Sequence, residues 1–192
     1  MKEVPRLTCR NLTVFRGGHP IIRDLSFDLP HGQALYVSGP NGSGKTTLLR
    51  GLATLSSTTG EISWENKEIG SDLKDILCYV GHQTPLKSTL TVSENLNVWG
   101  QNQLTYAEVF GLTPLMSTPS RFLSAGQRRR LTLACLLNPT RPLWLLDEPT
   151  VGLDEQSQKA FNHIMDAHMK DGGLIILTGH QKPTFPVREL IL

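Results

Sequence analysis

The chain has 192 residues, the size of one domain with at most one inserted lobe, and this length is enough to bury a full core. Lys and Arg total 19 against 17 for Asp and Glu, and a net charge of +2 gives no indication of a nucleic-acid partner. The three cysteines lie far apart and no apolar run reaches the roughly 18 to 20 residues that span a bilayer, so we expect neither a metal cluster nor a membrane segment, and any membrane role would come through a partner.

Two short strands are predicted near the N-terminus, over residues 7–15 and 21–29, with a Gly-Gly turn between them. Together with residues 61–64 they suggest an antiparallel layer laid against the rest of the chain. Phe15 closes the first strand, where its aromatic ring could stack on a nucleobase. Packing of the ring into the core is the alternative, and for a lone aromatic residue it is the commoner one.

A phosphate-binding loop follows, because the chain fits the pattern G-x-x-x-x-G-K-[ST] between a predicted strand at 34–38 and a predicted helix at 46–53. Glycines let the loop turn its N–H groups inward, and the helix start adds partial positive charge. Lys45 can reach the β and γ phosphates of a nucleotide, and the hydroxyl of Thr46 can hold Mg²⁺. The loop consists of Gly39, Pro40, Asn41, Gly42, Ser43, Gly44, Lys45 and Thr46.

A helical lobe is predicted after an apolar strand at 76–80 and the polar group Gly81-His82-Gln83. Residues 91–94 and 105–108 each fit the capping-box pattern, in which a hydroxyl residue and an acid three positions later satisfy each other's backbone donors. Two short helices are therefore expected, followed by a loop at 117–120.

Residues 124–127 are a third capping-box match and open a helix that Pro139 stops. The N–H groups at this helix start, with the Ser124 hydroxyl, could bind an anion, or the segment could be a plain helix cap. The basic run at 128–130 is interpreted as a solvated helix face, with lipid headgroups as an alternative partner.

Two adjacent carboxylates, Asp147 and Glu148, end the apolar run 143–146, which is typical of a parallel strand buried on both faces. Asp147 offers a hard oxygen for Mg²⁺ and Glu148 could polarise an attacking water, whereas a solvated turn is the alternative. A helix is predicted over 154–169, with the two glycines at 172 and 173 as its stop.

The last predicted strand, 174–177, leads to His180. A lone histidine is usually structural. Here, however, four apolar runs, which end at residues 38, 80, 146 and 177, each lead into a polar or Gly-rich group. The carboxyl ends of parallel strands lie at one edge of a sheet, so the sequence predicts that these groups meet there.

These motifs, in order, resemble those of the ABC-type ATPases. The segments that carry the resemblance are the loop from Gly39 to Thr47, Gln83, residues 123–127, residues 145–149, residues 152–154 and His180, which match the Walker A loop, Q-loop, signature motif, Walker B strand, D-loop and H-loop. The resemblance implies an α/β P-loop NTPase fold with a parallel sheet, a small antiparallel β subdomain and a short inserted helical lobe. It implies a single domain over 1–192, with the core in 1–83 and 123–192 and the helical subdomain in 84–122.

The resemblance also implies ATP and Mg²⁺ as cofactors and a role for each matching residue. Lys45 and the loop amides would hold the phosphates, Phe15 would stack on the base, Glu148 would be the general base and His180 would contact the γ-phosphate. Thr46, Gln83 and Asp147 would serve Mg²⁺. The signature residues Ser124, Ala125, Gly126 and Gln127 would complete the site of a second copy, next to the D-loop residue Asp154, so a homodimer is expected.

Within this family, residues 81–83, 123–130, 142–149 and 172–181 are similar to the ATP-binding subunit of the cytochrome c maturation haem exporter. That similarity implies multispanning membrane subunits as partners and a peripheral location on the cytoplasmic face of a bacterial inner membrane or the matrix side of a mitochondrial one. Ala125 stands where the family most often has glycine, and Val151-Gly152 replaces the usual Ser-Ala.

Three alternatives remain. The chain could serve a different ABC transporter. A soluble ABC ATPase acting on DNA or ribosomes would need a coiled coil, a second cassette or a basic surface, and none is visible here. A regulator that binds nucleotide without hydrolysing it is disfavoured, because Glu148 and His180 are both present.

Overall fold

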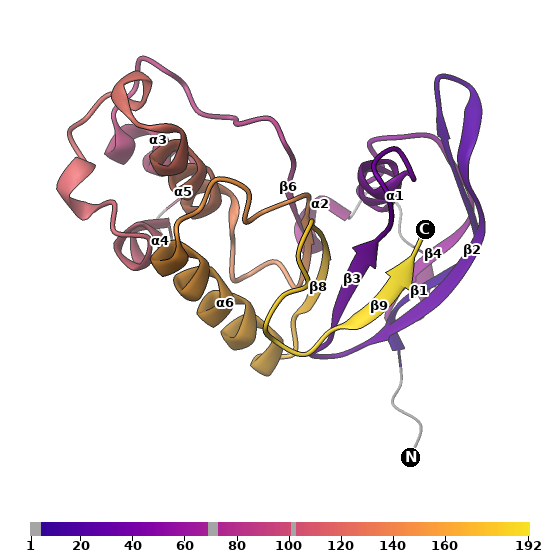
Figure 1. Ribbon diagram of the computed structural model, residues 1–192. Helices are drawn as coiled ribbons and strands as arrows, with labels where there is room; N and C mark the ends of the chain where they lie inside the picture. Colours follow the sequence, from indigo (N-terminus) through magenta and orange to yellow (C-terminus); the bar gives the residue numbers. More distant parts are fainter. Residues whose placement is uncertain (1–4, 69–72, 101–102) are drawn as a thin grey trace.

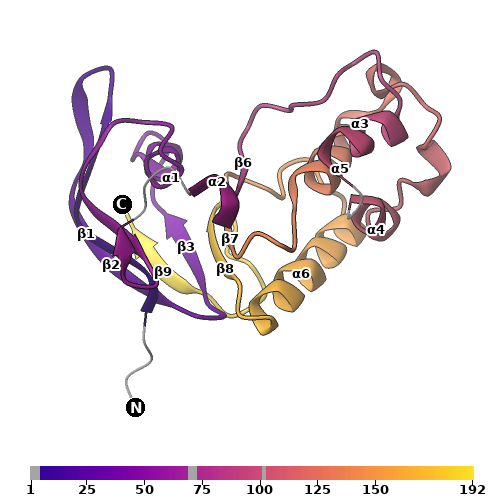
Figure 2. The ribbon, with the colours of Figure 1, turned by 180° about the vertical axis from the view of Figure 1, so that it is seen from behind.

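The computed structural model describes residues 5–68, 73–100 and 103–192 (Figure 1). Residues 1–4, 69–72 and 101–102, which belong to the domain ranges expected above, lie outside the described residues. The chain forms a parallel sheet and an antiparallel sheet, with the helices of a separate lobe gathered beside the parallel one, as both views show (Figures 1 and 2). This confirms the α/β fold class.

The parallel sheet has the strand order β6-β7-β8-β3-β9. Strands β7 and β8 are buried along their whole length, as their unbroken apolar runs predict. The predicted convergence of strand ends at one edge is confirmed, because all the pairings are parallel. The strands are β3 (Ala34–Ser38), β6 (Leu77–Val80), β7 (Leu143–Leu146), β8 (Leu174–Thr178) and β9 (Arg188–Ile191).

The sequence did not indicate β9. Its residues are mostly exposed, and it joins the sheet through backbone pairing with β3 at the edge. A short polar edge strand lacks the apolar run by which the other parallel strands were recognised.

The antiparallel sheet has the order β2-β1-β4-β5, and helix α1 packs between it and the parallel sheet. Leu48, Leu49 and Leu52 of α1 are buried in one apolar cluster with residues of both sheets. The elements are β1 (Pro5–Arg16), β2 (His19–Pro30), α1 (Lys45–Leu52), β4 (Thr58–Trp64) and β5 (Lys67–Glu68). This packing fixes the start of α1, and with it the phosphate-binding loop, against the sheet.

The helical lobe lies between β6 and β7 in the sequence, and α6 (Glu155–Lys170) packs on the same face of the parallel sheet as this lobe. The remaining elements are α2 (Leu73–Ile76), α3 (Val92–Trp99), α4 (Gln103–Val109), α5 (Ala125–Leu136) and the 3₁₀ turns η1 (Thr113–Leu115) and η2 (Ser120–Phe122). Among the described residues, no helix has both the length and the apolar character that a bilayer crossing requires.

Two of the three predicted capping boxes are confirmed. Thr91 and Ser124 each accept a hydrogen bond from the third helical residue, which bonds back to the cap backbone. The box at Thr105 is wrong, because α4 already begins at Gln103 and Thr105 lies inside the helix. A hydroxyl residue three positions before an acid is not specific to helix starts.

Candidate functional site

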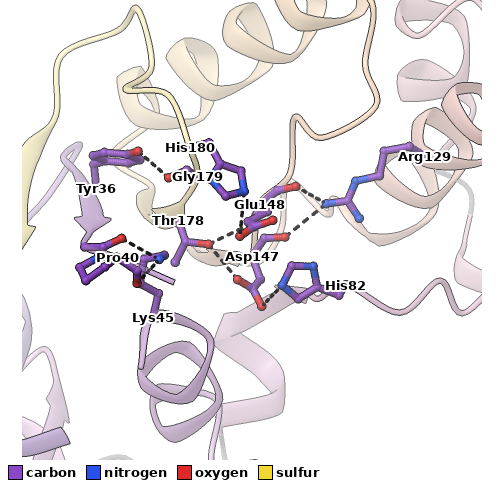
Figure 3. A network of polar contacts seen from close by, with 11 residues as sticks. Tyr36, Pro40, Lys45, His82, Arg129, Asp147, Glu148, Thr178, Gly179 and His180 are labelled. Atoms are coloured by element: carbon purple, nitrogen blue, oxygen red, sulfur yellow. Dashed lines mark hydrogen bonds and ion pairs between the residues drawn. The ribbon is translucent and has the colours of Figure 1, made fainter. Parts of the chain in front are cut away.

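The phosphate-binding loop joins β3 to α1, as its pattern predicts. Gly39 has a φ of +144°, and a Cβ there would lie 2.7 Å from the Leu192 carbonyl oxygen, so only glycine fits. The Lys45 ammonium donates hydrogen bonds to the carbonyl oxygens of Gly39 at 2.8 Å and Pro40 at 3.0 Å (Figure 3). Lys45 thus folds back on its own loop.

Asp147 is the most buried carboxylate of the site, with 1% of its residue surface exposed at the end of β7. The Thr178 hydroxyl donates a hydrogen bond of 2.8 Å to its Oδ1. The Nε2 of His82 lies 3.2 Å from its Oδ2, but this contact lacks hydrogen-bond geometry. Oδ2 is therefore buried without a hydrogen-bond donor among the described residues, which is costly unless something else satisfies the charge.

Glu148 follows in the left-handed region, with a φ of +47° that is strained for a residue with a side chain. Its backbone N–H donates a hydrogen bond of 3.0 Å to the Thr178 hydroxyl oxygen. Nε2 of His180 lies 3.6 Å from Oε1 of Glu148, and the two side chains face each other (Figure 3). The Tyr36 hydroxyl donates a 2.7 Å hydrogen bond to the Gly179 carbonyl oxygen and steadies the segment that carries His180.

Two adjoining cavities contain most of the predicted binding residues. The first, of about 430 Å³, brings the phosphate-binding loop together with Glu148 and His180; its lining includes Asn41, Gly42, Gly44, Lys45, Thr46, Thr47, Glu148 and His180. The second, of about 740 Å³, shares Thr46 and Thr47 with it and is also lined by Phe15, Gln83 and Asp147. Phe15 is half-buried at this wall rather than enclosed in the core.

The signature segment takes no part in the lining of either cavity. Ser124 and Ala125 are exposed at the start of α5 in the helical lobe, and the Ser124 hydroxyl accepts from the Gln127 N–H at 3.1 Å. Gly126 lies close to the D-loop, because a Cβ on it would stand 3.0 Å from the Gly152 carbonyl oxygen. The chain does not bring these residues to its own phosphate-binding loop.

Asp154 of the predicted D-loop is the N-cap of α6. Its carboxylate accepts a 2.8 Å hydrogen bond from the Ser157 N–H. Hydrogen bonding from Ser157 lowers the pKa of Asp154 below its usual value. The Asp154 carboxylate therefore stabilises the start of α6, whether or not it also acts at an interface.

The basic run was not interpreted correctly. Arg128 donates to the Leu123 carbonyl oxygen and Arg130 to that of Phe110 at 3.0 Å. Arg129 donates to carbonyl oxygens at the ends of β6 and β7. All three are half-buried and bind backbone, so they do not form a solvated face.

Thr178, His82 and Arg129 are contacts of the site that the motifs did not identify. A signal existed for the first two, because Thr178 is the last residue of β8 and His82 follows β6, at the edge where the parallel strands end. No local pattern marks Arg129, since its partners lie 18 to 48 positions away in the sequence.

Comparison with known proteins identifies the class to which this fold and site belong. Residues 22–151 match the family model described as "ABC transporter". Two solved structures agree with the fold. A putative ABC transporter ATP-binding protein from Pyrococcus furiosus has a TM-score of 0.81 at 23% identity, covering 97% of this chain and 96% of that one. An ATP-binding subunit of an ABC transporter has a TM-score of 0.79 at 21% identity over 91% of this chain and 79% of that one.

Curated relatives are more similar in sequence. The cytochrome c biogenesis ATP-binding export proteins CcmA of Rhodopseudomonas palustris (strain BisB5) and Nitrobacter winogradskyi are 41% and 42% identical to the chain, and each match covers 96% of both sequences. The CcmA of Nitrosomonas europaea is 39% identical over 98% of this chain and 96% of the relative. The chain therefore belongs to the ABC transporter family, and within it to the CcmA proteins.

Proposed function

We propose that the chain is the ATP-hydrolysing motor subunit of a membrane exporter that acts in c-type cytochrome biogenesis, with haem as the group exported or released. The observation that carries this proposal is the cavity in which the phosphate-binding loop faces Glu148 and His180. The names of the relatives, which are ATP-binding export proteins of cytochrome c biogenesis, support the export role.

The chemistry assigned to this site is hydrolysis of the terminal phosphate of ATP. The N–H groups of the phosphate-binding loop, the start of α1 and Lys45 would hold the phosphates, and Phe15 would stack on the base. Glu148 would accept a proton from the attacking water, and His180, whose Nε2 is 3.6 Å from Glu148, would contact the γ-phosphate beside it.

The residues present fit a magnesium ion. Oδ2 of Asp147 is buried without a hydrogen-bond donor among the described residues, and Thr46 and Gln83 line the same cavity. These are the hard oxygen ligands that Mg²⁺ takes in nucleotide sites. When bound, Mg²⁺ would neutralise charge on the phosphate oxygens.

A homodimer is part of the proposal, since the signature residues lie outside the cavities of their own chain. Ser124 is exposed and Gly126 is half-buried at the start of α5, where N–H groups and a hydroxyl can meet a phosphate. We propose that they meet ATP held by a second copy, in a dimer that ATP closes and hydrolysis opens.

The proposed partners are multispanning membrane subunits, and the proposed location is the cytoplasmic face of a bacterial inner membrane or the matrix side of a mitochondrial one. We propose the helical subdomain, residues 84–122, as the part that a membrane partner grips. Exposed apolar side chains in this segment, Val98, Trp99, Leu104, Val109 and Phe122, support that assignment.

The test is affinity purification of the tagged chain from detergent-solubilised membranes, with ATPase activity and haem absorbance measured on one sample. We expect a multispanning partner, haem or a haem-carrying chaperone, and activity that Glu148→Gln abolishes. A different membrane partner without haem would keep the motor but assign it to another transport system. Copurification with ribosomes or DNA and no membrane protein would contradict the transport role.

A further inference from the structure

Arg129 lies in the second turn of α5, yet its side chain leaves the helical lobe and reaches the catalytic edge of the sheet. Its Nη2 donates to the carbonyl oxygens of Glu148 at 2.9 Å and Asp147 at 3.3 Å (Figure 3). Its Nε donates to that of Pro149 at 3.1 Å, and its Nη1 to that of Gly81 at 3.3 Å. One guanidinium thus binds three consecutive carbonyls after β7 and one after β6.

This contact completes the support of the strained residue Glu148. The Glu148 N–H donates to the Thr178 hydroxyl oxygen, and its carbonyl oxygen accepts from Arg129 at 2.9 Å and from the Val151 N–H at 3.3 Å. A non-glycine residue in the left-handed region persists only when its surroundings hold it there. Side chains from two different elements therefore hold the two peptide groups of Glu148, together with one backbone hydrogen bond within the turn.

The four hydrogen bonds of Arg129 require a guanidinium, and they form in a largely buried place. Desolvation lowers the pKa of Arg129, while the nearby negative charges of Asp147 and Glu148 oppose that effect. A lysine has one nitrogen with three donors and could not reach four carbonyls arranged around a planar fork. The geometry is specific to the guanidinium.

Helix α5 begins at the signature segment and also carries Arg129, so it connects that segment to the turn that contains Glu148. Its N-cap is Ser124, and Arg129 lies five positions further on. A second tie lies three positions beyond Arg129, where the Thr132 and Thr84 hydroxyls are 2.8 Å apart, next to Gln83. A shift of the start of α5 would therefore move the Arg129 guanidinium that holds the Glu148 carbonyl.

We propose that Arg129 is a positioning residue for ATP hydrolysis, which holds the Asp147–Glu148 turn in its strained conformation and ties it to the signature helix. This proposal rests on the proposed function of Glu148 as general base. Arg129 contacts no residue of the phosphate-binding loop in these bonds, so it should affect the rate of hydrolysis and not the binding of ATP.

The test compares Arg129→Met with Arg130→Met in the complex purified from membranes. Arg130 is a matched control, because it is the next residue on α5 and also donates to a carbonyl oxygen, that of Phe110, away from the catalytic edge. We expect Arg129→Met to lower kcat by about 10- to 100-fold, as displaced catalytic groups do, with the Kd for ATP within about twofold of the parent. Arg130→Met should keep kcat within about threefold.

Equal losses in both variants, a loss of ATP affinity that matches the loss of kcat, or an unchanged kcat in Arg129→Met would overturn the proposal. If Arg129→Met does not fold, Arg129→Lys, which keeps the charge, should still lose at least about threefold in kcat, and full activity in it would also overturn the proposal. Failure of the proposed function gives a different result. If the parent protein has no ATPase activity, or if Glu148→Gln keeps its activity, the assignment of Glu148 as general base fails before that of Arg129 is tested.

Discussion

Lys45 shows how the isolated chain prepares for a nucleotide. The residue is 9% exposed, and its ammonium donates hydrogen bonds to the carbonyl oxygens of Gly39 and Pro40. These bonds replace solvent for a buried charge, and phosphate oxygens would take their place in the proposed complex with ATP.

Lys45→Ala should therefore weaken ATP binding itself, by roughly 10-fold or more, because a charge-assisted contact to the phosphates is lost. Isothermal titration calorimetry of the variant with ATP measures the change in Kd. Lys159→Ala, which removes an exposed lysine paired with Glu155 on α6, is the control and should bind ATP normally. Unchanged affinity in Lys45→Ala would count against the loop assignment.

Substitution of Glu148 should have the opposite effect, with turnover lost and ATP binding kept. Glu148→Gln keeps the shape of the side chain but cannot accept a proton, so ATP should stay bound while kcat falls by about 10²-fold or more. A single-turnover assay measures the rate of hydrolysis, and retention of ATP with the protein on a filter measures binding. Turnover at the normal rate would remove Glu148 from its assigned role.

At the scale of elements, the packing of α6 on the parallel sheet depends on an uncharged histidine. His168 is 7% exposed, and its ring stacks on Trp144 of β7 with the centroids 3.7 Å apart. A Cβ on Gly173 would lie 2.2 Å from its Nε2, so the glycine leaves the ring its room. His163, five positions earlier on the same helix, is exposed.

Burial lowers the pKa of His168 from 6.5 to about 4. Between these values the unfolded chain binds more protons than the folded one, so the free energy of unfolding falls as the pH drops through this window. The loss between pH 7 and pH 5 is about 2 kcal/mol from this group. The change levels off as the pH falls below about 4, where the folded chain also binds the proton.

Urea unfolding at pH 7 and pH 5 measures this effect, as the difference between the parent chain and His168→Phe. The phenylalanine keeps a ring against Trp144 but does not titrate, so the variant should lose about 2 kcal/mol less over the same interval. His163→Gln is the control and should keep the full pH dependence of the parent. An unaltered pH dependence in His168→Phe would show that His168 is not the group responsible.

At the scale of the whole molecule, the cavities and the signature segment lie apart. The phosphate-binding loop precedes α1 and the exposed Ser124 precedes α5, and these two helices lie apart in Figure 1. One chain by itself therefore does not assemble the full set of predicted groups. Two copies would form two composite sites if the dimer is symmetric.

Mixing two inactive variants tests this arrangement. In a dimer of Lys45→Ala with Ser124→Arg, one site carries both changes and the other carries neither. An equal mixture should therefore regain up to about a quarter of the parent ATPase activity, since half of the dimers are mixed and each has one intact site. Each variant alone is the control. No recovery, with mixed dimers shown by a pull-down through two tags, would contradict sites shared between copies.

The sequence by itself determined the fold class, the phosphate-binding loop, the strands whose ends meet at one edge and two of the three helix caps. These features depend on residues within a few positions of each other, on apolar runs and periods and on cap chemistry. It also placed Asp147, Glu148 and His180 at that edge, because parallel strands end on the same side.

Only the tertiary structure decided the rest. The exposed strand β9 joins the sheet through the backbone of a distant neighbour, and Thr105 proved to be inside a helix. Arg129 reaches the carbonyl oxygens of residues 81 and 147–149 only because α5 lies across the ends of β6 and β7. Such contacts depend on how elements pack against each other, and no pattern of neighbouring residues encodes that packing.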